Sequence, residues 1–487
     1  MVNLACALGS AILLVLLFPP FGLNWLAPFA LVPLVLLCAR EPSAKKRWLL
    51  GWAAGLVFWC GLCPWIQFVL EVHGGMGRWG GWGTFVLFGL YKGLPTALFT
   101  LLAGFLIRKW YALPAIAALW TGIDRLHAYT GFAWLPLGNA GINMPLPMRL
   151  APVTGVYGLT FLFAMLGCAV AFVVLKRPRF QLAWLLVFVI LLFLPRASRP
   201  SPPREKALLV QPNIDTEANW TKAFLDDTEN RLAQLSRGTG FRLIIWPEAP
   251  APFYPERADF RKYVSNIART SDAYFLFSGV AFTAEHAPLN SAFLFDPRGN
   301  AAGRYDKINL VPFGEFIPPF FHFVNRITQE AGDFASGKKI ELFAIDNHRA
   351  GAFICYESVL PDFVRQFTLG GAEVLLNLSN DGYFGNSAAH QQHLLIARMR
   401  AAENQRWLLR STNDGITAVI DPRGRITEQL APFAQTARIV DFSFEKGVTP
   451  YVRYGDWFAW SCLVTGGVLS LYSLVTKSAG SPKRRHP

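Results

Sequence analysis

Eight long apolar runs constrain the fold of this chain more than any other feature of its sequence. Seven lie within the first 195 residues, and the eight span residues 4–22, 24–39, 48–70, 82–106, 110–126, 152–175, 180–195 and 457–476. The second and seventh are short, but most approach the roughly 20 apolar residues that a helix needs to cross a bilayer. We therefore expect a polytopic α-helical membrane domain with about eight transmembrane helices, seven of them within residues 1–199.

Lys and Arg residues cluster beside these runs in a way that predicts their orientation. If each run crosses the membrane once, the basic clusters at 40–47, 108–109, 176–179 and 477–485 all fall on one side. Cytoplasmic loops are enriched in Lys and Arg, so this side is expected to be cytoplasmic. Both termini, including a basic tail, are then cytoplasmic, and residues 200–456 lie on the opposite side.

The net charge of +14 does not indicate a nucleic-acid partner. Residues 1–199 hold 15 Lys and Arg against three acids, and residues 457–487 hold four bases and no acid. Residues 200–456 hold 27 bases and 29 acids. The basic excess therefore accompanies the membrane runs, and the remaining part is close to neutral.

Residues 200–456 alternate between strand-like and helical patterns. The strand-like runs are 207–210, 243–246, 274–280, 292–295, 352–354, 374–378, 416–420 and 437–440. The helical patterns are 220–236, 256–270, 359–369 and 387–406. Strands separated by helices predict an α/β sandwich with its chemistry at the strand ends.

One of the seven cysteines lies in this segment, and it directly follows a strand. Cys355 comes after the apolar residues 352–354 and has no nearby cysteine to form a disulfide. A nucleophile at the end of a strand is held rigidly, and a thiolate is the strongest ordinary nucleophile. The alternative is a buried, inert cysteine, which is common in protein cores.

Two other stretches carry the groups that an attacking thiol needs. Glu248 ends the strand-like run 243–246 and is flanked by Pro247 and Pro250, which restrict the backbone around it. Lys307 follows a hairpin-like turn. The carboxylate can accept the thiol proton, and the ammonium can stabilise an oxyanion. Each residue alone is more often an ordinary surface charge, but together the three predict a catalytic triad.

These stretches resemble the signatures of a known superfamily. Trp-Pro-Glu at 246–248, Lys-x7-Glu at 307–315 and Ile-Cys-Tyr-Glu at 354–357 are similar, in order and spacing, to the signatures of the carbon–nitrogen hydrolase (nitrilase) superfamily. With the membrane runs, the motifs at 18–21, 310–315, 379–381 and 397–403 resemble bacterial apolipoprotein N-acyltransferases over nearly the whole chain. The resemblance implies a nitrilase-like α-β-β-α sandwich at 200–456, in the periplasm beside the bacterial inner membrane.

The resemblance also implies a reaction. A fatty acyl chain would pass from a membrane phospholipid, through a thioester on the enzyme, to the N-terminal amine of a diacylglyceryl apolipoprotein. Cys355 would be the nucleophile, Glu248 the base and Lys307 the stabiliser of the tetrahedral intermediate. No cofactor or metal is implied, and we expect a monomer.

Four further positions match supporting residues of the resemblance. Glu315 would support Lys307 and position substrate, the Tyr356 N–H would donate to the oxyanion, and Trp220 would lie near the substrate entrance. Glu357, next to the nucleophile, matches a position that matters in the family and would have a supporting or substrate-binding role. The chain departs from the family pattern at Tyr383, where Trp is frequent, and at Pro212, where Gly is usual. The apolar stretch 313–323 would dip into the bilayer or form a buried loop.

Two alternative functions remain open at this point. A membrane-tethered amidase would share the triad but would not need a multi-span anchor or apolar loops. A transporter or scaffold with an inactive outer domain would not need all three triad positions to be filled.

Several other residues have patterns that we interpret as structural. We interpret His390 and His393 as helix surface, because no third metal ligand is suitably spaced. Cys60 and Cys63 lie inside an apolar run without a redox fold around them. Lys92 and Asp124 lie in or near apolar runs, and we expect such side chains to reach the membrane interface.

Overall fold

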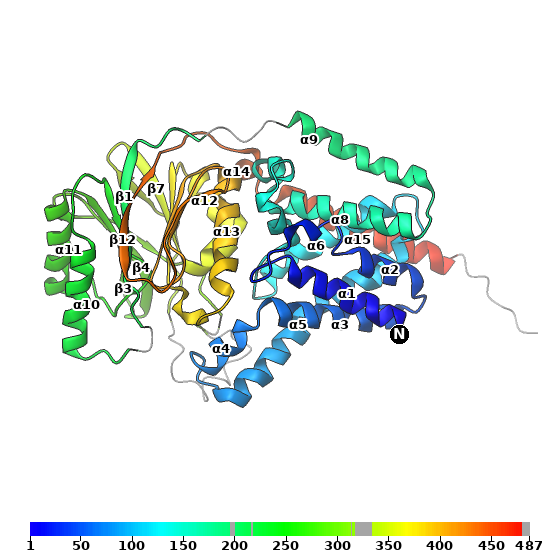
Figure 1. Ribbon diagram of the computed structural model, residues 1–487, viewed down its shortest axis with the longest axis horizontal. Helices are drawn as coiled ribbons and strands as arrows, with labels where there is room; N and C mark the ends of the chain where they lie inside the picture. The colour runs from blue at the N-terminus through cyan, green and yellow to red at the C-terminus, as the bar shows by residue number, and fades with distance from the viewer. Residues whose placement is uncertain (195–199, 216–217, 313, 317–333, 480–487) are drawn as a thin grey trace, which may run out of the picture. The chain divides into compact units, whose positions relative to one another are not determined.

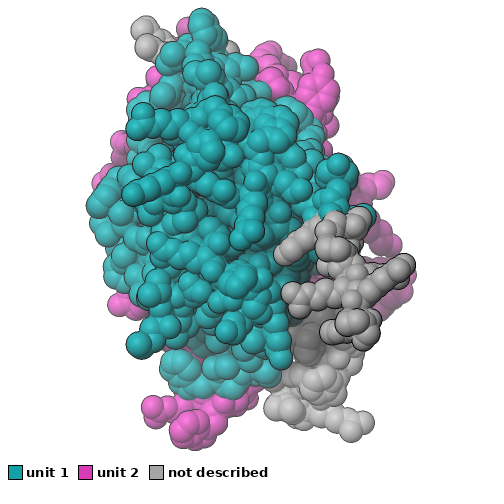
Figure 2. Space-filling model, turned by 90° about the vertical axis from the view of Figure 1, so that its right-hand side faces the viewer, with its two compact units in different colours: residues 1–64, 82–195, 456–487 teal, residues 65–81, 196–455 magenta. Residues whose placement is uncertain are grey.

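The computed structural model describes residues 1–194, 200–215, 218–312, 314–316 and 334–479. The chain forms two compact units, coloured separately in Figure 2. Unit 1 comprises residues 1–64, 82–195 and 456–487, and unit 2 comprises residues 65–81 and 196–455. The short segment 65–81 therefore belongs with the α/β part of the chain rather than with the helices that flank it in sequence.

Unit 1 is built from helices (Figure 1). The longer helices are α1 (Val2–Leu16), α2 (Val32–Arg40), α3 (Ala44–Leu62), α5 (Gly77–Leu106), α6 (Ala112–Leu126), α8 (Val156–Val174) and α15 (Trp457–Ala479). A 3-10 segment, Arg179–Val189, leads into the short α9 (Ile190–Phe193). Of the described helices, α5, α8 and α15 are long and apolar enough to cross a membrane. The apolar runs of the sequence therefore correspond to a helical unit that contains several candidate membrane-spanning helices.

Prolines lie where two of the apolar runs end or break as helices. The third run is divided into α3 and α4 (Trp65–Glu71), which meet at an angle of 72° and would count as a fourth span if taken together. Pro64 lies at this break, and proline removes a helical hydrogen bond and disfavours helical geometry before it. Pro19 and Pro20 similarly follow α1, which is 15 residues long.

Lys92 does not reach an interface, so that expectation is wrong. Its side chain in α5 is only 1% exposed. Its ammonium donates to the Phe132 carbonyl at 2.7 Å and to Thr130 Oγ1 at 2.8 Å, and it lies 4.8 Å from the Trp59 ring centroid. Asp124 also bonds within the unit, accepting from the Leu137 N–H at 3.1 Å. Acceptors inside the protein therefore replace water around the buried ammonium.

Unit 2 contains two six-stranded sheets. The first has the order β12-β1-β2-β3-β4-β5 and the second β11-β10-β9-β8-β7-β6. The strands of the first are β1 (Glu205–Gln211), β2 (Leu243–Ile245), β3 (Tyr274–Phe282), β4 (Pro288–Phe295), β5 (Ala301–Asp306) and β12 (Thr436–Phe442). Those of the second are β6 (Leu342–Ile345), β7 (His348–Ile354), β8 (Val374–Ser379), β9 (Leu408–Thr412), β10 (Ala418–Ile420) and β11 (Ile426–Gln429). Strands β1, β2 and β3 are parallel neighbours, as are β7, β8 and β9.

Helices cover the outer face of each sheet. In Figure 1, α10 (Lys222–Leu235) and α11 (Ala258–Ser271) lie outside the first sheet, and α12 (Pro361–Leu369) and α13 (Ala389–Asn404) lie on the far side of the second. This is the α-β-β-α sandwich that the resemblance implies, and it agrees with the α/β sandwich predicted from the alternating patterns. The four predicted helices and eight predicted strands are all present, and β5, β6, β9 and β11 are strands that the sequence patterns missed.

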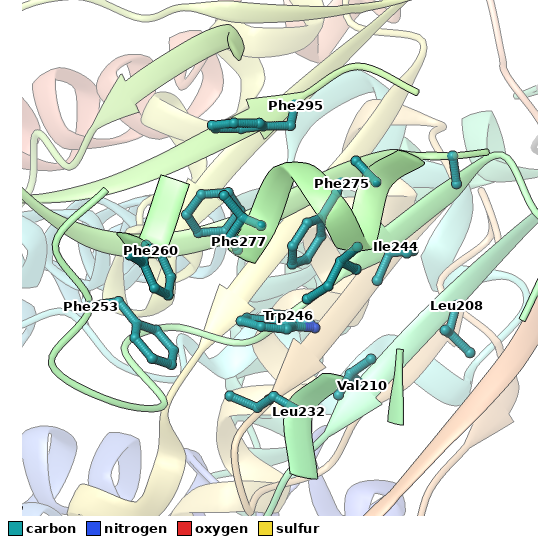
Figure 3. Close-up of a cluster of buried hydrophobic side chains, with 14 of the residues drawn as sticks. Leu208, Val210, Leu232, Ile244, Trp246, Phe253, Phe260, Phe275, Phe277 and Phe295 are labelled. Atoms are coloured by element: carbon teal, nitrogen blue, oxygen red, sulfur yellow. The ribbon is translucent and has the colours of Figure 1, made fainter. Parts of the chain in front are cut away.

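A cluster of apolar side chains fixes the first sheet to its helices (Figure 3). Trp246 lies within this cluster, fully buried, with its ring centroid 4.7 Å from that of Phe275. Its indole N–H also donates to Ser236 Oγ at 2.7 Å. Burying a large aromatic side chain contributes about 2–3 kcal/mol. Because Trp246 lies two residues before Glu248, this cluster anchors the start of the loop that carries the carboxylate.

Candidate active site

The three predicted triad residues all follow the ends of strands in unit 2. Glu248 lies three residues after β2, Lys307 directly follows β5, and Cys355 directly follows β7. The structure brings them together: Lys307 Nζ lies 3.1 Å from Glu248 Oε1, and both charges act on the Cys355 thiol. A carboxylate, an ammonium and a thiol therefore share one site.

Lys307 is the centre of the charged part of this site. Its side chain is 1% exposed, and its ammonium also contacts Glu315 Oε1 at 2.9 Å and Oε2 at 2.8 Å. Burial alone would lower the pKa of Lys307, but the carboxylates of Glu248 and Glu315 raise it well above its usual value. The amine therefore remains an ammonium ion and can stabilise negative charge that develops beside it.

Cys355 starts a tight turn with an unusual backbone. Its φ is 50°, in the left-handed region that non-glycine residues adopt at a cost of about 1–3 kcal/mol. Burial, and then the nearby Glu248 carboxylate, raise the pKa of the thiol, while Lys307 opposes them. The thiol is thus protonated at neutral pH. A protonated thiol needs a base before it can attack, and Glu248 is a carboxylate whose charge acts on it.

The sequence patterns missed Asn290, which connects the two carboxylates. Its side-chain amide donates to Glu248 Oε1 and to Glu315 Oε1, each at 2.8 Å. It lies on β4, just before the predicted strand 292–295. A buried amide in a strand is a signal for a polar partner, but only the structure identifies that partner.

Glu357 connects the turn of the nucleophile to the loop of the lysine. Its fully buried carboxylate accepts from the Tyr305 hydroxyl at 2.7 Å, and from the backbone N–H groups of Ile308, Asn309 and Ile354 at 2.9, 3.1 and 2.8 Å. Burial raises the pKa of Glu357 to about 7, and these hydrogen bonds act in the opposite direction. Glu357 therefore holds the start of the Cys355 turn and the residues after Lys307 in one hydrogen-bond network.

Replacing Glu357 with glutamine should loosen both loops. The amide has only one oxygen, so its NH₂ group must face at least one backbone N–H donor, which cannot accept a hydrogen bond. We expect a loss of about 2 kcal/mol in the free energy of unfolding and a fall in the acylation rate of Cys355 of about tenfold. Thermal unfolding and acylation kinetics of Glu357→Gln would test this, with Glu341→Gln, an exposed site, as control. Wild-type stability in Glu357→Gln would contradict it.

Tyr356 and Trp220, the other two predicted site residues, lie in different parts of unit 2. Tyr356 is buried in the turn that follows Cys355. Trp220 packs on Phe224 of α10, with ring centroids 5.2 Å apart, at the edge of the hydrophobic cluster. Among the described residues, no hydrogen bond or ring contact links Trp220 to the triad. Phe313 and residues 317–323 of the apolar stretch lie outside the described residues.

His390 and His393 are not on a helix surface, so that interpretation is wrong. Both lie on α13, with 4% and 0% of their side chains exposed. His390 bonds to the Gly385 carbonyl at 2.7 Å, and His393 lies 3.0 Å from Asp381. Polar partners inside unit 2 allow these rings to be buried, and the sequence pattern of α13 did not indicate such partners.

Comparison with known proteins gives two family matches that follow each other along the chain. Residues 206–447 match the carbon-nitrogen hydrolase family, and residues 10–169 match the apolipoprotein N-acyltransferase N-terminal domain. The first match covers the sandwich and all three triad residues. The second covers most of the helices of unit 1.

Relatives match over nearly the full length. An apolipoprotein N-acyltransferase from Geobacter metallireducens is 32% identical, with 97% of this chain and 95% of the relative covered. One from Chlorobaculum tepidum is 29% identical, with 94% of each covered. A solved nitrilase-superfamily amidase from Nesterenkonia is 19% identical, with a TM-score of 0.38 over 50% of this chain and 92% of that chain. A likeness this distant supports no conclusion about the reaction. The full-length matches establish the family instead: the chain belongs to the apolipoprotein N-acyltransferase family.

Proposed function

We propose that the chain transfers a fatty acyl group from a membrane phospholipid to the N-terminal amine of a diacylglyceryl apolipoprotein, through a thioester on Cys355. The observation that carries this is the convergence of a protonated thiol, a carboxylate and a buried ammonium. Together they can activate a nucleophile and stabilise the oxyanion that its attack creates. No step requires a cofactor.

In the first half-reaction, Glu248 accepts the proton of the Cys355 thiol as sulfur attacks the ester carbonyl of the phospholipid. The S–C bond forms, and the carbonyl electron pair becomes an oxyanion near Lys307 and the Tyr356 N–H. The oxyanion then collapses and the ester C–O bond breaks. Glu248 returns the proton to the departing oxygen, which leaves as a lysophospholipid.

In the second half-reaction, the α-amine of the acceptor attacks the thioester. The N–C bond forms, Glu248 takes the amine proton, and the C–S bond breaks. The sulfur regains a proton from Glu248, and the acyl chain leaves as an amide. Water must be kept from the thioester, or the enzyme would hydrolyse phospholipid instead. An amidase would use the same residues, but the full-length family match favours transfer.

The membrane arrangement that we propose follows the basic clusters and apolar runs. Residues 1–199 would contribute seven transmembrane helices and residues 457–476 an eighth, with both termini in the cytoplasm. Residues 200–456 would then face the periplasm beside the inner membrane, where both lipid substrates are within reach. The apolar helices α5, α8 and α15 support a membrane location. A monomer is sufficient, since the triad comes from one chain.

Intact-protein mass spectrometry of the detergent-purified chain would test the reaction. After incubation with phospholipid, we expect a fatty-acyl mass increment that hydroxylamine removes. Adding a diacylglyceryl-cysteine peptide should remove the increment and give the peptide an amide-linked acyl chain. No increment on a folded, lipid-exposed protein would overturn the thioester mechanism. An increment that is lost to water but never to the peptide would favour hydrolysis.

A further inference from the structure

A second buried polar cluster lies behind Cys355, and the reaction scheme does not use it. Asp381, His393 and Arg410 are all fully buried. Arg410 Nη2 donates to Asp381 Oδ2 at 2.7 Å and Oδ1 at 2.9 Å, and Ser379 Oγ donates to Oδ1 at 2.8 Å. Burial would raise the pKa of Asp381, but the charge of Arg410 holds it well below its usual range. Asp381 and Arg410 therefore form a fixed ion pair around the His393 ring.

The hydrogen bonds around His393 indicate which ring nitrogen carries its proton. Burial, and then Arg410, lower the pKa of His393, so the ring is neutral and has one N–H. Arg410 Nη2, which can only donate, lies 3.0 Å from Nδ1. The nearby Asp381 Oδ1 already receives protons from Ser379 and Arg410. We assign Nδ1 as the acceptor of the Arg410 hydrogen bond, and this assignment leaves the proton on Nε2.

This N–H points at the turn of the nucleophile. His393 Nε2 lies 3.3 Å from the Cys355 carbonyl oxygen and 2.7 Å from Ser358 Oγ. In a planar trans peptide, the carbonyl of one residue and the N–H of the next point in opposite directions. A hydrogen bond to the Cys355 carbonyl thus also fixes the direction of the Tyr356 N–H, away from His393. It also supports Cys355 in its costly left-handed conformation.

We propose that His393, held by the Asp381–Arg410 pair, is a positioning residue that aims the Tyr356 N–H at the oxyanion formed when Cys355 attacks. The inference rests on the proposed thioester mechanism. Preorganised donors act only if their direction is fixed before charge develops, and losing one typically costs 10²–10³-fold in rate. His393 would then affect the acylation step without touching substrate.

Two reactions of the same sulfur separate this role from a general structural one. Acylation by phospholipid passes through an oxyanion, whereas alkylation by iodoacetamide does not. We would measure both at Cys355 by peptide mass spectrometry in the full-length protein. His393→Leu removes the Nε2 donor, His393→Gln keeps an N–H near the same place, and His390→Leu is the matched control on the same helix. His390 is buried to a similar degree and lies 3.9 Å from Asp381, but its hydrogen bond goes to the Gly385 carbonyl and not to the nucleophile turn.

We expect His393→Leu to slow acylation about a hundredfold, with His393→Gln and His390→Leu within about fivefold of wild type and alkylation unchanged in all. If His393→Leu fails to fold, His393→Asn, which also lacks a donor at the Nε2 position, takes its place. Acylation at the wild-type rate in the folded Leu or Asn variant would overturn the inference, as would a parallel loss of alkylation. A wild-type protein that never becomes acylated would instead overturn the proposed function.

Discussion

Replacing Cys355 with alanine should abolish the acyl-enzyme and reduce acyl transfer by about 10⁴-fold or more. In both half-reactions the acyl carbon is bonded to this sulfur, so the remaining groups have nothing to activate. Lys307 and Glu248 would still pair with each other at 3.1 Å, so the site should keep its charge balance and the protein its fold. The measurement is intact mass after incubation with phospholipid, together with acylation of a diacylglyceryl peptide.

A matched control uses another buried cysteine. Cys462 lies in α15 and is 5% exposed, so Cys462→Ala makes the same chemical change far from the triad in sequence. It should keep the mass increment and the transfer rate of the wild type. An acyl group that persists in folded Cys355→Ala would place the nucleophile on another residue. Loss of the fatty-acyl mass increment in Cys462→Ala, but not in Cys355→Ala, would also place the nucleophile on another residue.

The strands that place Glu248 and Cys355 could be predicted because their residues are buried and apolar. β2 and β7 end in Ile-Ile and Phe-Ile, and the change to polar residues marks where the site begins. β5 and β11 are edge strands with half-exposed and charged residues, so they lack such a contrast. β9 is buried along its whole length, but it contains Arg410. This charged residue interrupts the apolar pattern that would otherwise predict a buried strand.

The supporting residues were harder to predict, because their partners are distant in sequence. Asn290 and Glu248 are 42 residues apart, and their contact depends on the pairing of β2, β3 and β4. The prediction for His393 is wrong for a related reason. α13 is buried around nearly its whole circumference, so polar residues do not mark a solvent-facing side. Its Arg400 and Glu403 pair with each other at 2.9 Å, again inside the protein.

Glutamine at position 248 should slow acylation about 10³-fold at pH 7 and make the remaining activity strongly dependent on pH. Glutamine has nearly the shape of glutamate but cannot accept the thiol proton, and a general base typically contributes 10²–10⁴-fold. The variant would have to lose that proton to solvent before the attack. Its rate should therefore rise about tenfold per pH unit as the thiolate fraction grows, while the pH stays below the pKa of the thiol.

The surroundings of Cys355 determine the sign of this effect. Burial raises the pKa of the thiol most, the negative charges of Glu248 and Asp381 raise it further, and Lys307 lowers it. Removing the charge of Glu248 leaves Lys307 in place, so the pKa of Cys355 should fall in the variant. Alkylation by iodoacetamide, which requires only the thiolate, should therefore become faster in Glu248→Gln while acylation at pH 7 becomes slower.

Single-turnover acylation between pH 6 and 9, followed by intact mass, would measure the profile. In the wild type Glu248 supplies the base inside the site, so the rate should change much less over the same range. Glu256→Gln, at an exposed position before α11, should behave as wild type at every pH. A flat profile for Glu248→Gln, or a rate equal to that of the wild type, would mean that another group takes the proton. Opposite changes in alkylation and acylation would instead show that Glu248 holds the thiol in its protonated form and removes the proton during attack.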